Sequence, residues 1–176
     1  MKKYLLILLI ITINNIQMIA QSFNTNGFLI GDTIVLFDRA KSSIATQFID
    51  NTNTDVYYEV EIISKKNDRF QIKLNPINYD SITVDINIFW WIETKNIGVG
   101  LRNCERSKIP IYDKPKKEST KKDVYVYAAE SVIANITDIK ENWLKISFET
   151  FDKKKITGWL SPNNQCFNLF TMCCGS

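Results

Sequence analysis

Hydrophobic and polar positions alternate along much of the chain, with the period of two that is typical of β-strands. The clearest case is 82–92 (ITVDINIFWWI), where every second residue from Ile82 to Ile92 is apolar. We expect a half-buried strand there. Further strands, rich in β-branched and aromatic residues, are expected at 56–63, 69–74, 124–128, 142–148 and 155–160. The sequence shows no sustained helical stripe, so it predicts an all-β fold.

Turn-forming residues separate these strands. Clusters of Asn, Asp, Lys and Pro lie at 50–55, 65–68, 113–123 and 151–155. Many short strands with frequent turns are typical of small barrels or sandwiches.

The chain also resembles itself at an offset of about 70 residues. Four pairs of segments keep their order along the chain: 32–43 with 107–119, 55–60 with 123–128, 68–74 with 141–147, and 90–104 with 158–173. Duplication is the favoured interpretation, and chance similarity between two β-rich segments is the alternative.

Residues 1–20 have the layout of a secretory signal peptide. Two lysines precede an apolar run from Tyr4 to Ile13, and a polar stretch leads to Ala20. We expect cleavage before Gln21, export to the periplasm or the medium, and no membrane span afterwards. An uncleaved anchor is the alternative, although the run is short for a bilayer.

The composition excludes several kinds of catalytic and metal-binding site. The chain has no histidine, which excludes Ser-His-Asp and Cys-His catalysis and histidine metal ligands. Removal of residues 1–20 takes away two of the 22 basic residues and none of the 19 acidic ones, which leaves a net charge of +1. Such a charge gives no overall attraction to nucleic acid, so we expect none as a partner.

The four cysteines are Cys104, Cys166, Cys173 and Cys174. In an exported protein they are disulfide candidates rather than metal ligands. A bond between the adjacent Cys173 and Cys174 is strained. Cys104 and Cys166 would then each pair with one of these two. We favour Cys166–Cys173, because its loop is short and local, and Cys104–Cys174 would then join the two halves. A zinc site is the alternative, but the spacing lacks two C-x-x-C pairs, and we expect neither a metal nor another cofactor.

Residues 109–115 (IPIYDKP), 141–146 (ENWLKI) and 156–164 (ITGWLSPNN) resemble segments of exported bacterial SH3-like (SH3b) domains. In that family an apolar–aromatic–Asp start opens a long loop, a Trp-containing strand follows a tight turn, and a Gly–aromatic–apolar–Pro segment closes the barrel. The resemblance is clearest over 105–165. Gly158 of the closing segment fits a close approach between backbones.

The resemblance implies two small SH3-like β-barrels in tandem. The first, divergent unit covers 21–103, and the second covers 104–176 with a cysteine-containing tail. The weaker copy of the pattern in the first unit consists of Phe37, Asp38, Phe70 and Trp91.

The resemblance also implies a ligand-binding groove lined by Tyr112, Trp143, Trp159 and Pro162. Alternation within 142–148 places Leu144 inward and Trp143 outward. Such an aromatic trough suits prolines of an extended peptide or the apolar faces of sugar rings. Burial of the two tryptophans in the core is the competing interpretation.

Lys114, Lys116 and Lys117 lie in the long loop that borders this groove in SH3 folds. They are expected to form a basic rim for an anionic surface polymer or an acidic peptide. Simple solvation of the loop is the alternative.

No catalytic residue is expected. A glycosidase needs two facing carboxylates, and neither spacing nor motif singles out a pair among Glu59, Glu61, Asp85, Glu93, Asp138, Glu141 and Glu149. The sequence has no phosphate loop, nucleophile elbow or metal motif.

These observations favour a non-enzymatic exported binding module that recognises cell-wall peptide, glycan or a surface protein of the envelope. Domains of this family usually accompany a catalytic domain, and the sequence shows none. The alternative is a periplasmic or secreted protein–protein module of the inhibitor, immunity or scaffold type.

Overall fold

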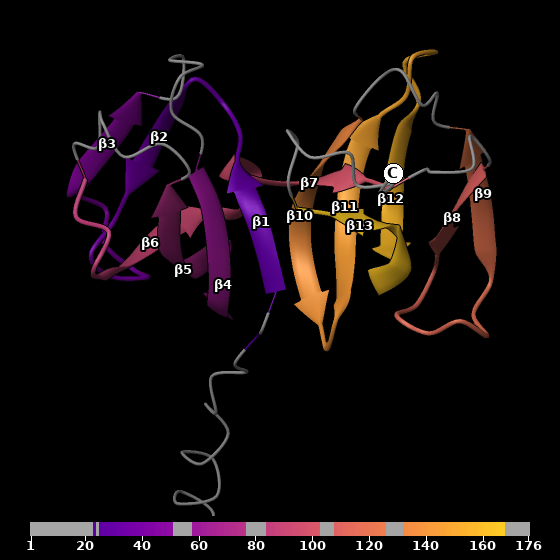
Figure 1. The fold of residues 1–176 in the computed structure, drawn as a ribbon, viewed down its shortest axis with the longest axis horizontal. Helices are drawn as coiled ribbons and strands as arrows, with labels where there is room; N and C mark the ends of the chain where they lie inside the picture. Colours follow the sequence, from indigo (N-terminus) through magenta and orange to yellow (C-terminus); the bar gives the residue numbers. More distant parts are fainter. Residues whose placement is uncertain are drawn as a thin grey trace, which may run out of the picture.

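The computed structural model describes residues 23, 25–50, 58–76, 84–102, 108–125 and 132–167, and its regular structure is antiparallel β-strand (Figure 1). The strands of the first half are β1 (Thr25–Leu29), β2 (Thr33–Leu36), β3 (Gln47–Asp50), β4 (Tyr58–Lys66), β5 (Arg69–Pro76), β6 (Phe89–Glu93) and β7 (Ile97–Leu101). Those of the second half are β8 (Lys108–Tyr112), β9 (Lys121–Tyr125), β10 (Ile133–Lys140), β11 (Trp143–Glu149), β12 (Lys155–Leu160) and β13 (Gln165–Cys166). Two 3-10 turns, η1 (Thr94–Asn96) and η2 (Pro162–Asn164), precede β7 and β13. The all-β prediction is confirmed.

Most of these strands belong to one sheet of 11 strands. Its order is β6-β5-β4-β1-β7-β10-β11-β12-β8-β9, with β13 paired to β7, while β2 and β3 form a separate pair. In Figure 1 the first half lies on the indigo and magenta side and the second on the orange and yellow side. The strand β7 joins the halves, because it pairs with β1, β10 and β13.

The strand pairings of the first half recur in the second. The β2–β3 hairpin corresponds to β8–β9, and the β4–β5–β6 meander corresponds to β10–β11–β12. Each meander is followed by a 3-10 turn and a final strand, β7 or β13. The isolated bridge between Phe37 and Trp91 corresponds to the pairing of Tyr112 with Trp159. The two halves therefore share one pattern of neighbours.

Two tight turns set the correspondence residue by residue. Asn67, between β4 and β5, and Glu141, between β10 and β11, both adopt the left-handed conformation, with φ of 58° and 55°. The residue two positions after each of them opens the next strand: Arg69 in β5 and Trp143 in β11. Arg69 and Trp143 therefore occupy equivalent positions.

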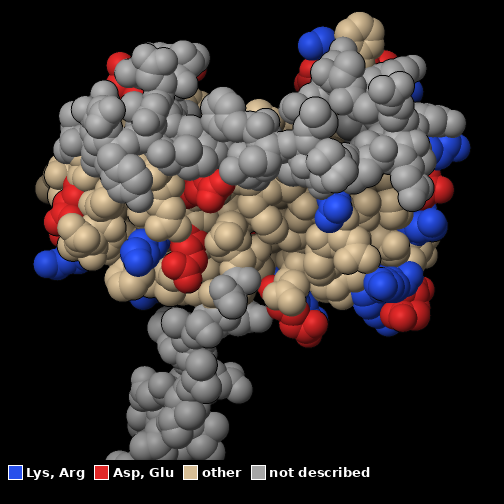
Figure 2. Space-filling model, in the orientation of Figure 1, with Lys and Arg blue, Asp and Glu red and all other residues tan. Residues whose placement is uncertain are grey.

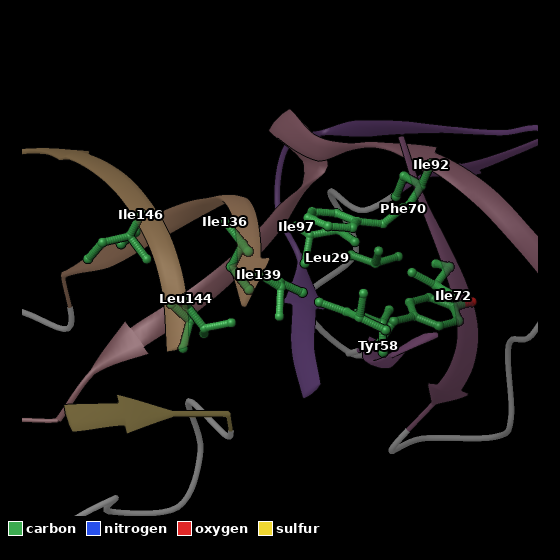
Figure 3. Close-up of a cluster of buried hydrophobic side chains, with 14 of the residues drawn as sticks. Leu29, Tyr58, Phe70, Ile72, Ile92, Ile97, Ile136, Ile139, Leu144 and Ile146 are labelled. Carbon is green, nitrogen blue, oxygen red and sulfur yellow. The ribbon is translucent and has the colours of Figure 1, made fainter. Parts of the chain in front are cut away.

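The buried side chains of both halves form one continuous hydrophobic cluster. Figure 3 shows side chains of β10 and β11, such as Ile136 and Leu144, in one group with Leu29 of β1 and Phe70 of β5. Leu144 and Ile146 are fully buried, as the alternation predicts. Burial alternates along β4 and β5 in the same way, so each strand gives one face to the core.

Gly158 lies where β12 packs closely against β8. A Cβ atom at this position would collide with Cγ2 of Ile111 and would lie 3.0 Å from the carbonyl oxygen of Tyr112. The expected close approach between backbones is therefore present, and it requires glycine.

The strand expected over 82–92 is wrong at 84–88, since β6 is Phe89–Glu93, and residues 82 and 83 lie outside the described part of the chain. Asp85 favours the bends and turn at 84–88: its Oδ1 accepts the backbone N–H of Asn87, and its carbonyl oxygen accepts Nε1–H of Trp90, both at 2.8 Å. Such local bonds compete with strand pairing. Ile88, expected on the buried face, is 42% exposed.

The other expected strands agree better with the structure. Those at 69–74, 142–148 and 155–160 are confirmed as β5, β11 and β12. Those at 56–63 and 124–128 are confirmed in their described parts, by β4 and β9. The pattern does not predict β1, β2, β3, β7, β8, β10 or β13. In β1 and β7, glycines interrupt the alternation.

One of the four predicted repeat blocks is wrong. The described part of 55–60 lies in β4, whereas the described part of 123–128 lies in β9. The strand β4 pairs with β1 and β5, and β9 pairs with β8 at the end of the sheet. The true counterpart of β4 is β10, because both precede an equivalent tight turn.

The sheet continues across the expected boundary between 21–103 and 104–176. Besides the pairing of β7 with β10, Lys65 of β4 reaches across to β10, where its Nζ donates to the carbonyl oxygen of Thr137 and to Oδ1 of Asp138, both at 2.9 Å. The two halves are thus hydrogen-bonded to each other through backbone and side chains.

Candidate functional site

Three of the four residues expected to line the groove lie on one face of the sheet. Tyr112 ends β8 and is directly cross-strand from Trp159 of β12, which places both side chains on the same face. The rings of Tyr112 and Trp143 meet edge to face, with centroids 5.1 Å apart and planes at 89°, an arrangement that aromatic rings favour. Tyr112 and Trp159 are partly exposed. Pro162 is exposed in η2.

The alternation predicts that Trp143 faces solvent, and this prediction is wrong. Trp143 lies on the face opposite Leu144, as expected, but only 9% of it is exposed. Tyr112 packs against its indole and contributes to covering it. The exposed part of the aromatic cluster therefore consists of Tyr112 and Trp159, and Trp143 packs against Tyr112.

The equivalent positions in the first half carry Phe37, Arg69 and Trp91. Trp91 bridges Phe37 just as Trp159 pairs with Tyr112. The sequence match assigned Phe70 to this copy of the site, and that assignment is wrong. Phe70 is fully buried, and Arg69 takes the place of the second tryptophan.

Arg69 closes the site of the first half. Its guanidinium carbon lies 3.5 Å from the centre of the Phe37 ring, a cation–π contact. Its Nη1 donates to the carbonyl oxygen of Ser42 at 2.7 Å and, more weakly, to that of Ala40 at 3.3 Å. The loop after β2 is therefore fastened to β5 by one side chain.

The lysines expected to form the rim are exposed on the loop between β8 and β9. They are Lys114, Lys116 and Lys117. Ser119 ties this loop together, because its Oγ accepts the backbone N–H of Lys114 at 3.3 Å and donates to the carbonyl oxygen of the same residue at 3.0 Å. Figure 2 shows basic and acidic side chains gathered at the lower right, over this loop.

A further lysine, which the sequence analysis did not single out, lies beside the aromatic cluster. Lys145 of β11 is directly cross-strand from Trp159 on one side and from Asp138 on the other. Asp138 is already paired with Lys65 at 2.9 Å. Among the described residues Lys145 forms no ion pair, so a positive charge remains on the aromatic face.

Several of the acidic residues considered for catalysis form local ion pairs. Glu93 pairs with Lys95 at 2.5 Å and Glu149 with Lys153 at 3.2 Å. Within the described ranges no group of three or more His, Cys, Asp or Glu side chains gathers where it could hold a metal ion.

Perturbed pKa values occur away from the aromatic cluster. In the turn between β11 and β12, hydrogen bonds from Lys154 and from Thr150 lower the pKa of Asp152, and the bond to Asp152 raises the pKa of Lys154. In the core, burial raises the pKa of Tyr58. The side chains of Asp152 and Lys154 are exposed, so they stabilise a turn rather than prepare a proton transfer.

Cys166 is buried in β13 and is not a free thiol. Cys104, Cys173 and Cys174 lie outside the described residues, as does the signal peptide expected at 1–20. The pairing of the cysteines stays a prediction.

The equivalence of Arg69 and Trp143 is set by the backbone of the two tight turns. Each stands two residues after a turn residue, Asn67 or Glu141, that adopts positive φ. An alignment of these turns, rather than of the aromatic residues, finds it. Lys145 has no comparable signal, because its significance depends on its neighbours across the sheet.

Comparison with known proteins gives no match, whether to a family model, to a curated protein or to a solved structure. In the part of the chain that the structure describes, no helix has the length and apolar character needed to span a membrane.

Proposed function

We propose that the protein is an exported, non-enzymatic binding module of two SH3-like units, whose second unit recognises cell-wall peptide or glycan. The ligand would contact Tyr112 and Trp159, with Pro162 at the edge of the surface. The lysines of the β8–β9 loop would flank it.

The repeated pattern of strands supports two related units. Each segment that carries the SH3-like resemblance lies in a strand and the turn beside it. Residues 109–115 lie in β8 and the start of its loop, 141–146 in the tight turn and β11, and 156–164 in β12 and η2. In this proposal β7 closes the first unit and opens the second, since it pairs with both β1 and β13.

The observation that carries the proposed function is the partly exposed pair Tyr112 and Trp159. Their cross-strand pairing holds two rings side by side on one face, and Trp143 supports the first ring from behind. Rigid aromatic surfaces bind prolines and the apolar faces of sugar rings with little loss of conformational entropy. Three of the seven carboxylates considered for catalysis are in ion pairs: Asp138, Glu93 and Glu149.

The test is co-sedimentation with purified peptidoglycan sacculi. The full chain is expressed, exported and purified under oxidising conditions, and Trp159→Ala is compared with Trp91→Ala. Trp91 is the matched control, because it has the same place in the first half and is also partly exposed. We expect Trp159→Ala to lose at least about tenfold in affinity, as removal of a central aromatic anchor does, and Trp91→Ala to pellet like the wild type.

Wild-type protein that stays in the supernatant would contradict wall binding. Equal loss in both variants would contradict a site confined to the second unit. The first result would favour the protein–protein alternative, which capture from an envelope extract then examines. The second would place the wall-binding surface on both units.

A further inference from the structure

The β8–β9 hairpin differs from its counterpart in charge. Between Lys108 and Tyr125 the chain carries six lysines and three acidic residues, whereas between Thr33 and Asp50 it carries two basic and two acidic residues. The two hairpins have the same strand pairing, so the excess charge is a property of the second half alone.

Most of this charge is not neutralised within the protein. Lys121 pairs with Asp123 at 3.5 Å. Among the described residues Lys114, Lys116 and Lys117 form no ion pair. Their side chains project from the loop that Ser119 ties together, so the charges are held on a hydrogen-bonded frame.

The basic loop and the aromatic surface are continuous through Tyr112. Tyr112 is the last residue before the loop, and Lys121 is its cross-strand neighbour on β9. On the other side of the aromatic pair lies Lys145, next to Trp159. Lysine side chains therefore flank the two exposed rings on both sides, and Lys121 does so as part of its ion pair with Asp123.

We infer that this surface binds a glycan that carries repeated carboxylate groups. The rings would stack on the sugar faces, while the lysines would pair with carboxylates along the strand. The charged groups are lysines, which act as point charges and lack the bidentate geometry of arginine. Recognition would thus depend on the spacing of charge along a polymer rather than on one group. The inference rests on the proposed function and specifies its ligand class.

The test measures affinity for soluble polygalacturonate, with dextran as the neutral glycan and poly-glutamate as the polyanion without sugar rings. The full chain is compared with Lys116→Glu/Lys117→Glu and with the matched control Arg39→Glu/Lys41→Glu, which reverses two charges on the β2–β3 loop. Salt dependence is measured for each protein, because each lysine–anion contact adds to its slope.

We expect polygalacturonate to bind more tightly than dextran and poly-glutamate. The Lys116/Lys117 reversal should weaken binding at least about tenfold and reduce the salt slope by roughly two, and the Arg39/Lys41 reversal should change neither. Unchanged affinity after the first reversal, or equal loss after both, would overturn the inference. Equal binding of poly-glutamate would show that charge alone suffices, and would also overturn it.

Failure of this inference is distinguishable from failure of the proposed function. If sacculi bind through Trp159 while the lysine reversal changes nothing, only the ligand class is wrong. If wild-type protein does not bind sacculi but binds polygalacturonate through the lysines, the wall-binding function is wrong and the inferred anion-binding surface stands.

Discussion

The two halves of the sheet place different side chains at the same register position. In the first half Arg69 stacks on Phe37 and donates to backbone carbonyls of the neighbouring loop. In the second half Trp143 meets Tyr112 edge to face. Equivalent strands thus carry Arg69, which binds the neighbouring loop, in the first half, and Trp143, which packs against another aromatic ring, in the second.

The outer faces of the two halves also differ. Phe48 pairs with Val35 and is 60% exposed, whereas the corresponding residue of the second half is Asp123. Phe89 is 52% exposed, and its counterpart is Thr157. The first half therefore presents apolar side chains where the second presents polar and charged ones. Equivalent backbones do not imply equivalent surfaces.

Of the differences between the two halves, the one at Trp143 is expected to have the largest effect on stability. We expect Trp143→Ala to lower the free energy of unfolding by about 3 kcal/mol, because it removes a buried indole and leaves a cavity beside Tyr112. Urea denaturation measures the loss. Trp143→Phe, which keeps a ring, should lose much less. A Trp143→Ala protein as stable as the wild type would contradict the burial of this side chain.

Gly158 gives the next largest effect. In the first half the corresponding position holds Trp90, which is 2% exposed, so the two halves pack differently under equivalent strands. Gly158→Ala should cost about 2 kcal/mol, because the new methyl group collides with Ile111. Thermal unfolding compares it with Thr157→Ala, an exposed neighbour on the same strand. If Thr157→Ala were destabilised and Gly158→Ala were not, the requirement for glycine at position 158 would be contradicted.

Arg69→Ala tests the role of the residue that takes the place of Trp143 in the first half. Loss of the cation–π contact and of the bonds to the loop should cost about 1 kcal/mol, since the side chain is partly exposed. Hydrogen exchange should become faster in the loop, for example at the Ser42 amide, which donates to the carbonyl oxygen of Arg39. Arg69→Lys keeps the charge but lacks the planar fork, and should restore little. An unchanged rate of hydrogen exchange would show that the loop keeps its structure without the contacts of Arg69.

The smallest expected effect is a difference in alkaline stability. Burial raises the pKa of Tyr58 above its ordinary value of 10.0. The protonated phenol therefore favours the folded state. Its contribution is complete below pH 10.0 and is lost as pH rises through the folded-state pKa. The counterpart, counted from the tight turns, is Val132, which does not ionise.

Urea denaturation at increasing pH checks this prediction. Tyr58→Phe should remove part of the stability loss seen above pH 10.0 in the wild type. The same alkaline loss in wild type and variant would assign it to other groups.

The sequence predicts much of the framework and little of the site. Period-two alternation identifies β5, β11 and β12 and the buried positions Leu144 and Ile146, because inside and outside are set by the local backbone. It fails over 82–92, where Asp85 offers the backbone local hydrogen bonds instead of a strand partner. Alternation describes which face a residue takes, but not whether the residue takes part in a strand.

The site could be predicted only in part. The family resemblance brought Tyr112, Trp143 and Trp159 together, and the register of β8, β11 and β12 places them on one face. It did not find Lys145, which matters because Asp138, its neighbour across the sheet, is already paired with Lys65. That pairing joins residues far apart in the chain.

The amino-acid sequence alone thus specifies an all-β chain with tight turns, an inward face that includes Leu144, and a lysine-rich loop after Tyr112. The cover over Trp143 and the closure of the corresponding site by Arg69 arise from the tertiary arrangement of the strands. The physical reason is the range of the interactions. Alternation and turn formation act within a few residues, whereas the cover over an outward face comes from strands whose pairing is fixed by the whole sheet.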